Sequence, residues 1–461
     1  MGFSCRRANE CLYKKELDEL KEELALVRFE LEDLKAKRYK PKNKPPQDSL
    51  PLKPPKKKGG LFGHMGWFRQ KPTKIDRIEK VRLNSCPLCG GRDLTECKGI
   101  HRHIQQDIVF PQLKTTLFKK HLYYCRGCKR VIAAKGDDEL PQSYIGPVAK
   151  SFALFLKHGV KISDRDITNL FDKIFNLKIK SSSVAGFRAQ LKNQAQHIYD
   201  KLLQSLRESS FLHIDETGWN ISGKNHWLWK FSNKRISLTH IDKSRGQKVL
   251  EDILGKDYEG TIISDFLSAY NTIKAKQKQR CLIHLLRDLK KVIRYFYDDK
   301  EVLRYTRKLK RLLEKAVELH KDYQGRRWDN IYYHRRELIT QTLLDFRFPN
   351  PNKRILNRFV KRLNRHKDEL FCFLYHKDID FHNNHAEQQI RPDVIFRKIT
   401  FQNRSQEGAQ NHQVIMSILQ TAKLNNLDPI KTLRQILLRK NPLADIVSSI
   451  ERAPPQLKYA G

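Results

Sequence analysis

The sequence is short of acidic residues and has no long apolar run. It holds 51 Asp and Glu against 91 Lys and Arg, which gives its 461 residues a formal net charge of +40. No stretch approaches the ~18 consecutive apolar residues of a membrane span. The first residues lack the apolar segment of a signal peptide, and Arg6 stands where a myristoylation signal has Ser or Thr. We therefore expect a soluble, cytoplasmic protein without membrane contact.

The sequence contains enough hydrophobic residues for a core and enough basic residues for a strongly positive surface. Hydrophobic residues make up 39% of the chain, which excludes wholesale disorder. The length suits roughly two to four domains. A charge surplus of this size attracts polyanions, so nucleic acid is the expected partner and association with a nucleoid would follow. A merely soluble basic protein, or a ribosome-associated one, is the alternative.

The N-terminal pattern predicts a coiled coil and a tether. Apolar residues alternate spacings of four and three, at Tyr13, Leu17, Leu20, Leu24, Val27, Leu31 and Leu34. The spacing predicts a leucine zipper over residues 10–38 that joins two protomers, although a helix folded onto its own domain would show the same pattern. Residues 39–80 form a basic, proline-rich linker, which either lies along phosphates or is a passive spacer.

Two CxxC pairs predict a zinc ribbon over residues 81–136. Each pair offers two thiolates from one turn, and clustered cysteines in a reducing compartment indicate a metal site. The four expected Zn²⁺ ligands are Cys86, Cys89, Cys125 and Cys128, with Cys97, His101 and His103 as substitutes. The ribbon either serves only as a scaffold or contacts DNA. The basic residues that would make this contact are Arg126, Lys129 and Arg130.

Residues 140–206 have the pattern of a helical DNA-binding segment. Ser163 and Asp166 form a capping pair, and apolar residues follow at helical spacing. A loop to residues 181–183 precedes a second helix. Two short helices in a basic protein suggest a helix-turn-helix. The connecting loop is longer than the usual tight turn, however, so a plain helical packing unit explains the pattern equally well.

After Ser210 the pattern changes to strands. Residues 211–214, 227–231, 236–240 and 261–264 read as strands, and residues 247–254 read as a short helix. A further apolar segment at 281–283 leads into His284. Three successive strands, a helix and then further strands describe a mixed α/β sheet.

Three acids in this region stand where they could carry chemistry. Asp215 and Asp265 each follow a predicted strand, so neighbouring strands could place them side by side, and Glu387 lies in a polar stretch at 383–392. Converging carboxylates require a divalent cation, and oxygen-only ligands favour Mg²⁺ or Mn²⁺ over Zn²⁺. Two such ions would promote a phosphodiester displacement. Alternatively, the aspartates only terminate strands, and Glu387 completes a capping box with Asn384.

Taken together, several of these stretches resemble a known family. They are residues 213–219 with 227–229, 264–271, 281–287, and 383–392 with Arg397 and Lys398. They resemble the insertion-sequence-66 family of bacterial transposases. The order of zipper, zinc ribbon, helical DNA-binding segment and catalytic part agrees with that family from about residue 10 to 435.

The resemblance implies a ribonuclease H-like catalytic domain at 207–425, with a helical insertion at about 288–377 and a helical tail at 426–461. Asp215, Asp265 and Glu387 become its catalytic acids and its Mg²⁺ or Mn²⁺ ligands. The expected DNA contacts are His284, Arg391, Arg397 and Lys398. His284 could instead be a satisfied core histidine, and the three cations could be solvated surface charge.

The implied function is that of a DDE-type transposase. A homodimer or higher oligomer would bind double-stranded DNA at the terminal inverted repeats, cleave the 3′ ends and join them to target DNA. Accessory proteins of the same element are candidate partners. Two alternatives remain open: a DNA-binding regulator or domesticated remnant, and a metal-dependent nuclease of the same fold that cleaves without joining.

Overall fold

The computed structural model describes residues 113–119, 122–127, 130–133, 136–141, 143–348 and 354–448. All of them belong to one compact unit, which runs from Phe110 to Gly461. The predicted coiled coil, the linker and the first cysteine pair of the zinc ribbon lie outside the described residues. Of the second pair, Cys125 ends β1 (Leu122–Cys125), which pairs antiparallel with β2 (Arg130–Ala133).

Helices α2 (Pro147–Phe155), α3 (Asp164–Phe175) and α4 (Ser181–Arg207) precede the sheet, and one π-helical turn (Leu156–Val160) follows α2. The predicted capping pair is confirmed, because the Ser163 hydroxyl accepts a hydrogen bond from the Asp166 N–H at 3.1 Å. α4 packs lengthwise against α12 (Gln406–Leu424) and also contacts α2 and α13 (Pro429–Leu437). This part of the chain therefore contributes to the main core, and its role in reading DNA stays a prediction.

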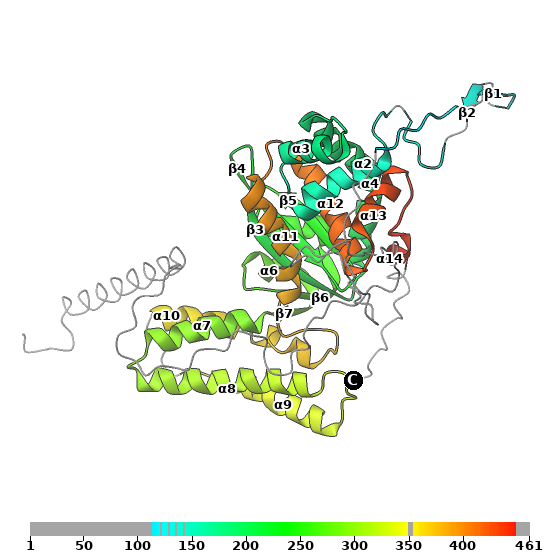
Figure 1. The fold of residues 1–461 in the computed structure, drawn as a ribbon. Helices are drawn as coiled ribbons and strands as arrows, with labels where there is room; N and C mark the ends of the chain where they lie inside the picture. The colour runs from blue at the N-terminus through cyan, green and yellow to red at the C-terminus, as the bar shows by residue number, and fades with distance from the viewer. Residues whose placement is uncertain are drawn as a thin grey trace, which may run out of the picture. The chain divides into compact units, whose positions relative to one another are not determined.

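The sheet has five strands in the order β5-β4-β3-β6-β7 (Figure 1). β3 (Phe211–Ile221), β4 (Lys224–Ser232) and β5 (Ser237–Asp242) form an antiparallel meander. β6 (Asp257–Ser264) pairs parallel with β3, and β7 (Lys274–Arg280) pairs parallel with β6. In the chain, α5 (Gln247–Leu254) lies between β5 and β6, and α6 (Ala269–Thr272) lies between β6 and β7. The predicted mixed α/β sheet is confirmed.

One predicted strand end is wrong. The sequence pattern ends the first strand before Asp215, because Asp, Gly and Asn are frequent turn residues. β3 instead continues to Ile221 and pairs with β4 along its whole second half. The turn comes at Ser222 and Gly223, which both have positive φ (49° and 79°), as the tight turn of a twisted hairpin requires. Asp215 therefore lies inside the central strand.

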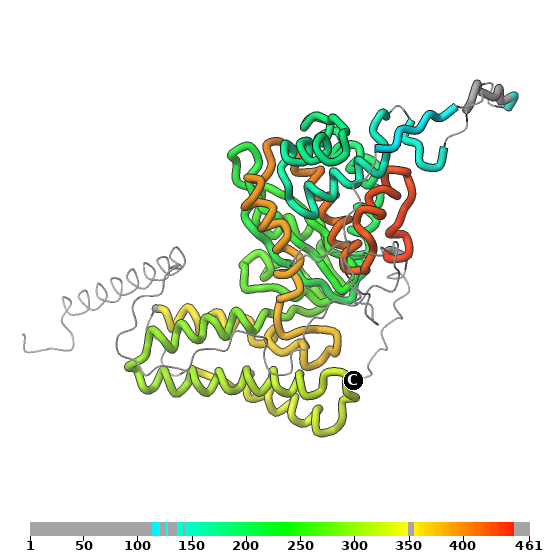
Figure 2. The backbone as a smooth tube through the Cα atoms, in the orientation of Figure 1, coloured from blue at the N-terminus to red at the C-terminus, as the bar shows by residue number. Residues whose placement is uncertain are grey.

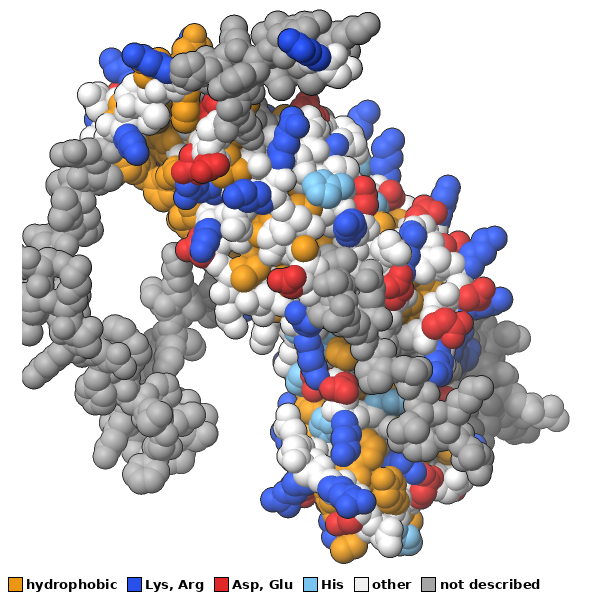
Figure 3. All heavy atoms as spheres, turned by 90° about the vertical axis from the view of Figure 1, so that its right-hand side faces the viewer, with side chains coloured by type: hydrophobic (Ala, Val, Ile, Leu, Met, Phe, Trp, Pro, Cys, Tyr) orange, Lys and Arg blue, Asp and Glu red, His pale blue; other side chains and the backbone are white. Residues whose placement is uncertain are grey.

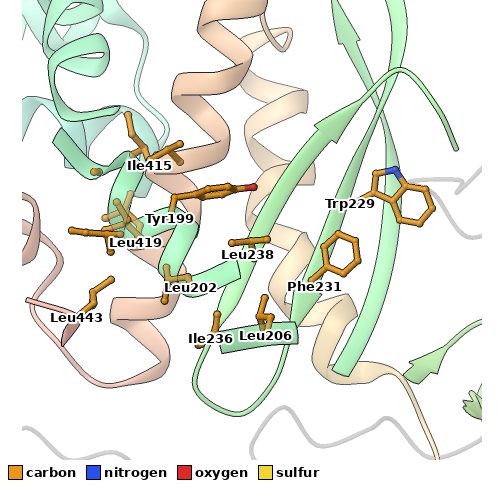
Figure 4. Packing of buried hydrophobic residues seen from close by; sticks show 14 of the residues in the cluster. Tyr199, Leu202, Leu206, Trp229, Phe231, Ile236, Leu238, Ile415, Leu419 and Leu443 are labelled. Atoms are coloured by element: carbon orange, nitrogen blue, oxygen red, sulfur yellow. The ribbon is translucent and has the colours of Figure 1, made fainter. Parts of the chain in front are cut away.

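Helices cover both faces of this sheet. On one face, α4, α5, α12 and α13 bury the main core, to which Leu202, Trp229 and Ile415 belong (Figure 4). On the other face, α11 (Asn384–Thr400) packs against β3 and β4 through a smaller cluster that includes Trp219 and Phe396. The last described helix is α14 (Ala444–Ser448). Side chains of β3 therefore alternate between the main core and the face that carries α11.

Polar side chains of α12 accept hydrogen bonds from the backbone of the edge strand β5. The Gln413, Ser417 and Thr421 side chains follow one another at intervals of four residues, so they form one stripe of the helix. They accept hydrogen bonds from the N–H groups of alternate β5 residues at 2.9, 2.8 and 3.2 Å respectively; these residues are Ile241, Thr239 and Ser237. The outward-facing donors of β5 are thereby paired without another strand.

Between β7 and α11 the chain leaves the sheet and forms a helical lobe (Figure 2). The lobe contains α7 (Leu282–Tyr295), α8 (Lys300–Asp322), α9 (Asn330–Asp345) and α10 (Arg354–Arg365), followed by two 3-10 turns (Lys367–Glu369 and Cys372–Leu374). It has its own core, which includes Leu285, Leu313 and Phe359. None of the helices in the described parts of the chain combines the length and apolarity needed to cross a membrane.

Candidate active site

Two of the predicted acids follow the paired residues of two adjacent parallel strands. β3 and β6 pair in register from Phe211 with Thr261 to His213 with Ile263. Asp215 comes two residues after the last of these pairs on β3, and Asp265 comes two residues after it in the turn that directly follows β6. Neighbouring strands lie ~4.8 Å apart, so the paired strands lead both acids to the same end of the sheet.

The Asp215 carboxyl group lies in a negative environment. Burial raises its pKa from 3.8 to about 7, and three neighbouring carboxylates contribute; they are Glu216, Asp265 and Glu387. A single backbone contact acts in the opposite direction, because the Glu216 N–H donates to Oδ1 of Asp215 at 3.0 Å. The three predicted acids therefore interact electrostatically. Their mutual repulsion is what a bound cation would relieve.

Asp265 lies in a turn that a buried arginine organises. Its Oδ1 accepts a hydrogen bond from the Leu267 N–H at 2.8 Å, so one carboxylate oxygen caps a turn at the end of the strand. Arg280, fully buried at the end of β7, donates to the Asp265 carbonyl at 2.9 Å. Its Nε pairs with Glu369 at 2.5 Å. The turn that carries the second acid is thereby attached to the helical lobe.

Asn383 fixes the start of α11 and, with it, Glu387. The buried Asn383 donates through Nδ2 to the Ile214 carbonyl at 2.7 Å, and its Oδ1 lies 3.1 Å from Nδ1 of His213. Burial lowers the pKa of His213 to about 3, so the imidazole is neutral and donates from Nδ1. Since Ile214 directly precedes Asp215, this one side chain ties the N-terminus of α11 to the strand position beside the first acid.

The capping-box alternative for Glu387 is wrong. α11 begins with Asn383 as its N-cap, so Glu387 is the fourth residue of the helix, whereas a capping box requires the third. The Asn383 side chain makes no cap bond because it is engaged with β3. Among the described residues, the Glu387 carboxylate has no hydrogen-bond partner. It lies in the first turn of α11, where the helix dipole favours a negative charge.

A fourth acid, Glu216, lies on the opposite face of β3, and sequence reasoning missed its role. Its buried side chain accepts hydrogen bonds from the Tyr270 hydroxyl at 2.6 Å and from Arg245 at 2.8 Å. Arg245 also lies over the Trp227 ring, 4.3 Å from its centroid. Burial raises the pKa of Glu216. Glu216 therefore holds α6 and the loop before α5 beside β3, and only its position directly after Asp215 signals this in the sequence.

Cys281 and His284 lie at the start of α7, close to the acids. Cys281 is buried, and its Sγ accepts a hydrogen bond from the Asn383 N–H at 3.3 Å. Burial raises the pKa of its thiol. His284 is half-buried, and its Nδ1 is enclosed without a hydrogen-bond partner among the described residues. Cys281 thus supports Asn383, whereas contact of His284 with DNA stays a prediction.

The basic residues after Glu387 differ in their surroundings. Arg391 and Lys398 are exposed. Arg397 instead donates to the Thr217 hydroxyl at 2.9 Å and to the Gly218 carbonyl, so it anchors α11 to β3. Phosphate contact through Arg391 and Lys398 stays a prediction. For Arg397, the attachment to β3 is the contact that the structure shows.

A buried ion pair, which the sequence pattern does not reveal, holds the middle of α11. Nζ of Lys230 on β4 lies 2.9 Å from Oδ2 of Asp393, and both side chains are fully buried. His412 of α12 lies 2.9 Å from the other Asp393 oxygen. Burial alone would raise the pKa of Asp393, but the Lys230 ammonium and the His412 contact lower it overall. The ion pair therefore fixes α11 against the sheet beyond Glu387.

Metal binding stays a prediction for both proposed sites, the three acids and the zinc ribbon. The described part of the chain contains no group of three or more His, Cys, Asp or Glu side chains placed to hold a metal ion. Of the zinc-ribbon residues, Cys86, Cys89, Cys128 and Lys129 lie outside the described residues. Cys125 ends β1, Arg126 is exposed in the turn that follows, and Arg130 begins β2. The ribbon therefore stays a prediction.

Comparison with known proteins identifies the family. The Transposase IS66 family matches residues 142–411, a range that contains β3 to β7, the helical lobe and all three acids. The chain is also similar to the uncharacterized protein y4qI of Sinorhizobium fredii, with 23% identity over 442 residues that cover 84% of this chain and 75% of that protein. Since the family match spans more than half of the 461 residues, the chain belongs to the IS66 family of transposases.

Proposed function

We propose that the chain is the DDE-type transposase of an insertion sequence, with Asp215, Asp265 and Glu387 as the catalytic acids of a ribonuclease H-like domain. The observation that carries this proposal is the arrangement of the three supporting elements. The β3–β6 pairing ends two residues before each of the two aspartates, and Asn383 attaches the first turn of α11 to the residue before Asp215.

The donor set fits Mg²⁺ or Mn²⁺. All three side chains offer only carboxylate oxygens, the ligands that these cations prefer. Burial raises the pKa of Asp215, and the neighbouring negative groups raise it further; a cation would act against both effects. When bound, the metal would activate the attacking oxygen and stabilise the leaving one in a phosphodiester displacement.

The remaining residues of the site set positions. Asn383 holds α11, and with it Glu387, against β3. Arg280 holds the turn of Asp265 through the backbone carbonyl, which leaves the carboxylate free of that contact. Lys230 and Asp393 fix α11 one and a half turns beyond Glu387. These contacts fix the elements that carry the three acids, so that little rearrangement would be needed when a cation draws the carboxylates together.

The proposed reaction has two steps. Water first attacks the phosphodiester at each 3′ end of the element and releases a 3′-hydroxyl. That hydroxyl then attacks a target phosphodiester, and the 3′ oxygen of the target strand leaves. We propose that the zinc ribbon and the segment with α3 and α4 recognise the terminal inverted repeats. The N-terminal zipper would join the two protomers that hold the two ends.

The test uses the gene's own flanking DNA on a plasmid, incubated with purified full-length protein and Mg²⁺. We compare the wild type with Glu387→Gln and with the control Glu407→Gln, which changes an exposed acid in the first turn of α12. End-specific cleavage and joining by the wild type and the control, but not by Glu387→Gln, supports the proposal.

Three other outcomes would contradict it. Cleavage without joining would indicate a nuclease. Equal binding with no cleavage by any of the proteins would indicate a regulator. Cleavage by Glu387→Gln at the wild-type rate would remove Glu387 from the active site.

A further inference from the structure

The outer faces of α7 and α10 carry charge of only one sign. Six of their side chains are exposed and make no ion pair or hydrogen bond with another described residue. We call these six side chains the basic track; they are Arg287, Lys290 and Arg294 of α7, and Arg358, Lys361 and Arg365 of α10. On each helix the three positions are separated by three and four residues, so they form one row.

The two rows face the same side of the helical lobe. α7 and α10 pack side by side, and their apolar faces enter the same core, to which Leu289 and Leu363 contribute. Asp288 of α7 forms an ion pair with Arg362 of α10 at the seam between them. Since both helices bury the face opposite their basic row, the rows run next to each other on the surface, ~8–10 Å apart at the helix axes.

This arrangement is unfavourable for a surface that meets only water. Like charges three and four residues apart destabilise a helix by ~0.2–0.5 kcal/mol per pair. The single acid of α7, Asp288, is already paired with Arg362 and lies 3.6 Å from Lys291, and α10 has no acid. By contrast, α8 intersperses acids along its length, for example in the Lys310–Glu314 pair at 3.4 Å. Acidic and basic side chains are likewise mixed on the face drawn in Figure 3.

The seam between the two rows reaches the turn that carries the second acid. The Arg362 guanidinium at the seam lies 4.9 Å from the centroid of the Phe266 ring, and Phe266 directly follows Asp265. α7 begins at Leu282, next to the buried Cys281 that contacts Asn383. A linear polyanion that lies on the track would therefore approach the carboxylates.

We propose that the basic track binds the phosphate backbone of duplex DNA next to the strand that enters the active site. Fourteen helical residues extend about 21 Å, a length over which a B-form duplex presents about a dozen phosphates. The contact is with phosphates and not with bases, so it positions DNA without reading its sequence. The inference rests on the proposed function only in taking duplex DNA as the substrate.

The test is the salt dependence of DNA binding by the full-length protein in EDTA, where no cleavage is needed. Two triple variants each neutralise one row: Arg287→Ala/Lys290→Ala/Arg294→Ala and Arg358→Ala/Lys361→Ala/Arg365→Ala. The matched control, Lys423→Ala/Lys431→Ala/Lys440→Ala, removes three exposed charges on and beside α12 and α13. Each protein binds a duplex with the terminal repeat and a random duplex of equal length, in ~50–300 mM salt.

We expect the slope of log affinity against log salt to become shallower by about 0.9 per lost contact, so by up to about 2.7 for each row. The change should be equal for both duplexes, and the control should keep the wild-type slope. Replacing the four arginines by lysine should also keep the slope, because the charge remains. If a triple variant does not fold, Arg294→Gln and Arg365→Gln each provide a test with an expected change of about 0.9.

An unchanged slope in all row variants would overturn the proposal. So would a change confined to the terminal-repeat duplex, because that would mean base recognition. A change in oligomeric mass at an unchanged slope would assign the face to contact between copies of the chain. Failure of the Glu387→Gln experiment together with a shallower slope would leave the track in place and refute only the catalytic assignment.

Discussion

The raised pKa of Asp215 predicts that this residue destabilises the metal-free protein above neutral pH. The folded protein keeps the proton up to about pH 7, whereas the unfolded chain releases it near pH 3.8. The free energy of unfolding therefore falls as the pH rises between these values and stays low above pH 7. Asp215→Asn removes the ionisation and should raise the free energy of unfolding at alkaline pH.

The size of the effect follows from the shift. A change from 3.8 to about 7 corresponds to about 4 kcal/mol at pH 8. Asp215 is only partly buried, so screening by solvent reduces the expected gain to about 2 kcal/mol. At pH 4.5 the gain falls to about 1 kcal/mol, because the unfolded chain is itself partly protonated there. At roughly 2 °C per kcal/mol, the melting temperature should rise by about 4 °C at pH 8.

The assay is thermal unfolding of the full chain, followed by circular dichroism from pH 4.5 to 8.5 in EDTA. Asp257→Asn, which changes an exposed carboxyl group at the other end of β6, serves as the control and should shift the melting temperature little at any pH. Adding Mg²⁺ should stabilise the wild type more than Asp215→Asn, because the variant has lost a ligand. A gain that is independent of pH, or a loss of stability at pH 8, would refute the reasoning.

Two further predictions concern the contacts that hold α11. Asn383→Ala should lower the rate of DNA cleavage at least tenfold while the salt dependence of DNA binding stays at the wild-type slope, because it releases Glu387 from β3 without removing a surface charge; an unchanged cleavage rate would deny Asn383 a positioning role. Lys230→Met should lower the free energy of unfolding by about 3–5 kcal/mol, since Asp393 then stays buried without its cation; urea unfolding measures this. The double variant Lys230→Met/Asp393→Leu should recover most of the loss, and equal destabilisation in both would count against the ion pair as the cause.

Local sequence patterns were sufficient for most of the sheet. Alternating apolar residues predicted β4 and β5, and the predicted helix at 247–254 coincides with α5. The pattern ends the first strand too early because turn propensity is local and does not include pairing with β4. Asp215 to Gly218 pair with β4, and the buried Trp219 packs under α11, so tertiary contacts override the turn preference.

The contacts that support the site could not be predicted in this way. Asn383 meets Ile214 across 169 residues, and Arg280 meets Glu369 across 89. Neither pair leaves a periodic or local signal, because each depends on the path of the chain through the helical lobe. The three acids were proposed from the positions of the strand ends and from the family resemblance. Their catalytic role awaits the Glu387→Gln experiment.

The side chains of α12 also determine whether another strand can pair with the edge of the sheet. An edge strand with unpaired N–H groups is a template on which another chain can add a strand, and such pairing leads to domain swapping or fibres. On β5 these donors are already taken by Gln413, Ser417 and Thr421. The sheet is therefore closed to strand addition along this edge. Unlimited edge-to-edge association of such sheets is thereby prevented on this side.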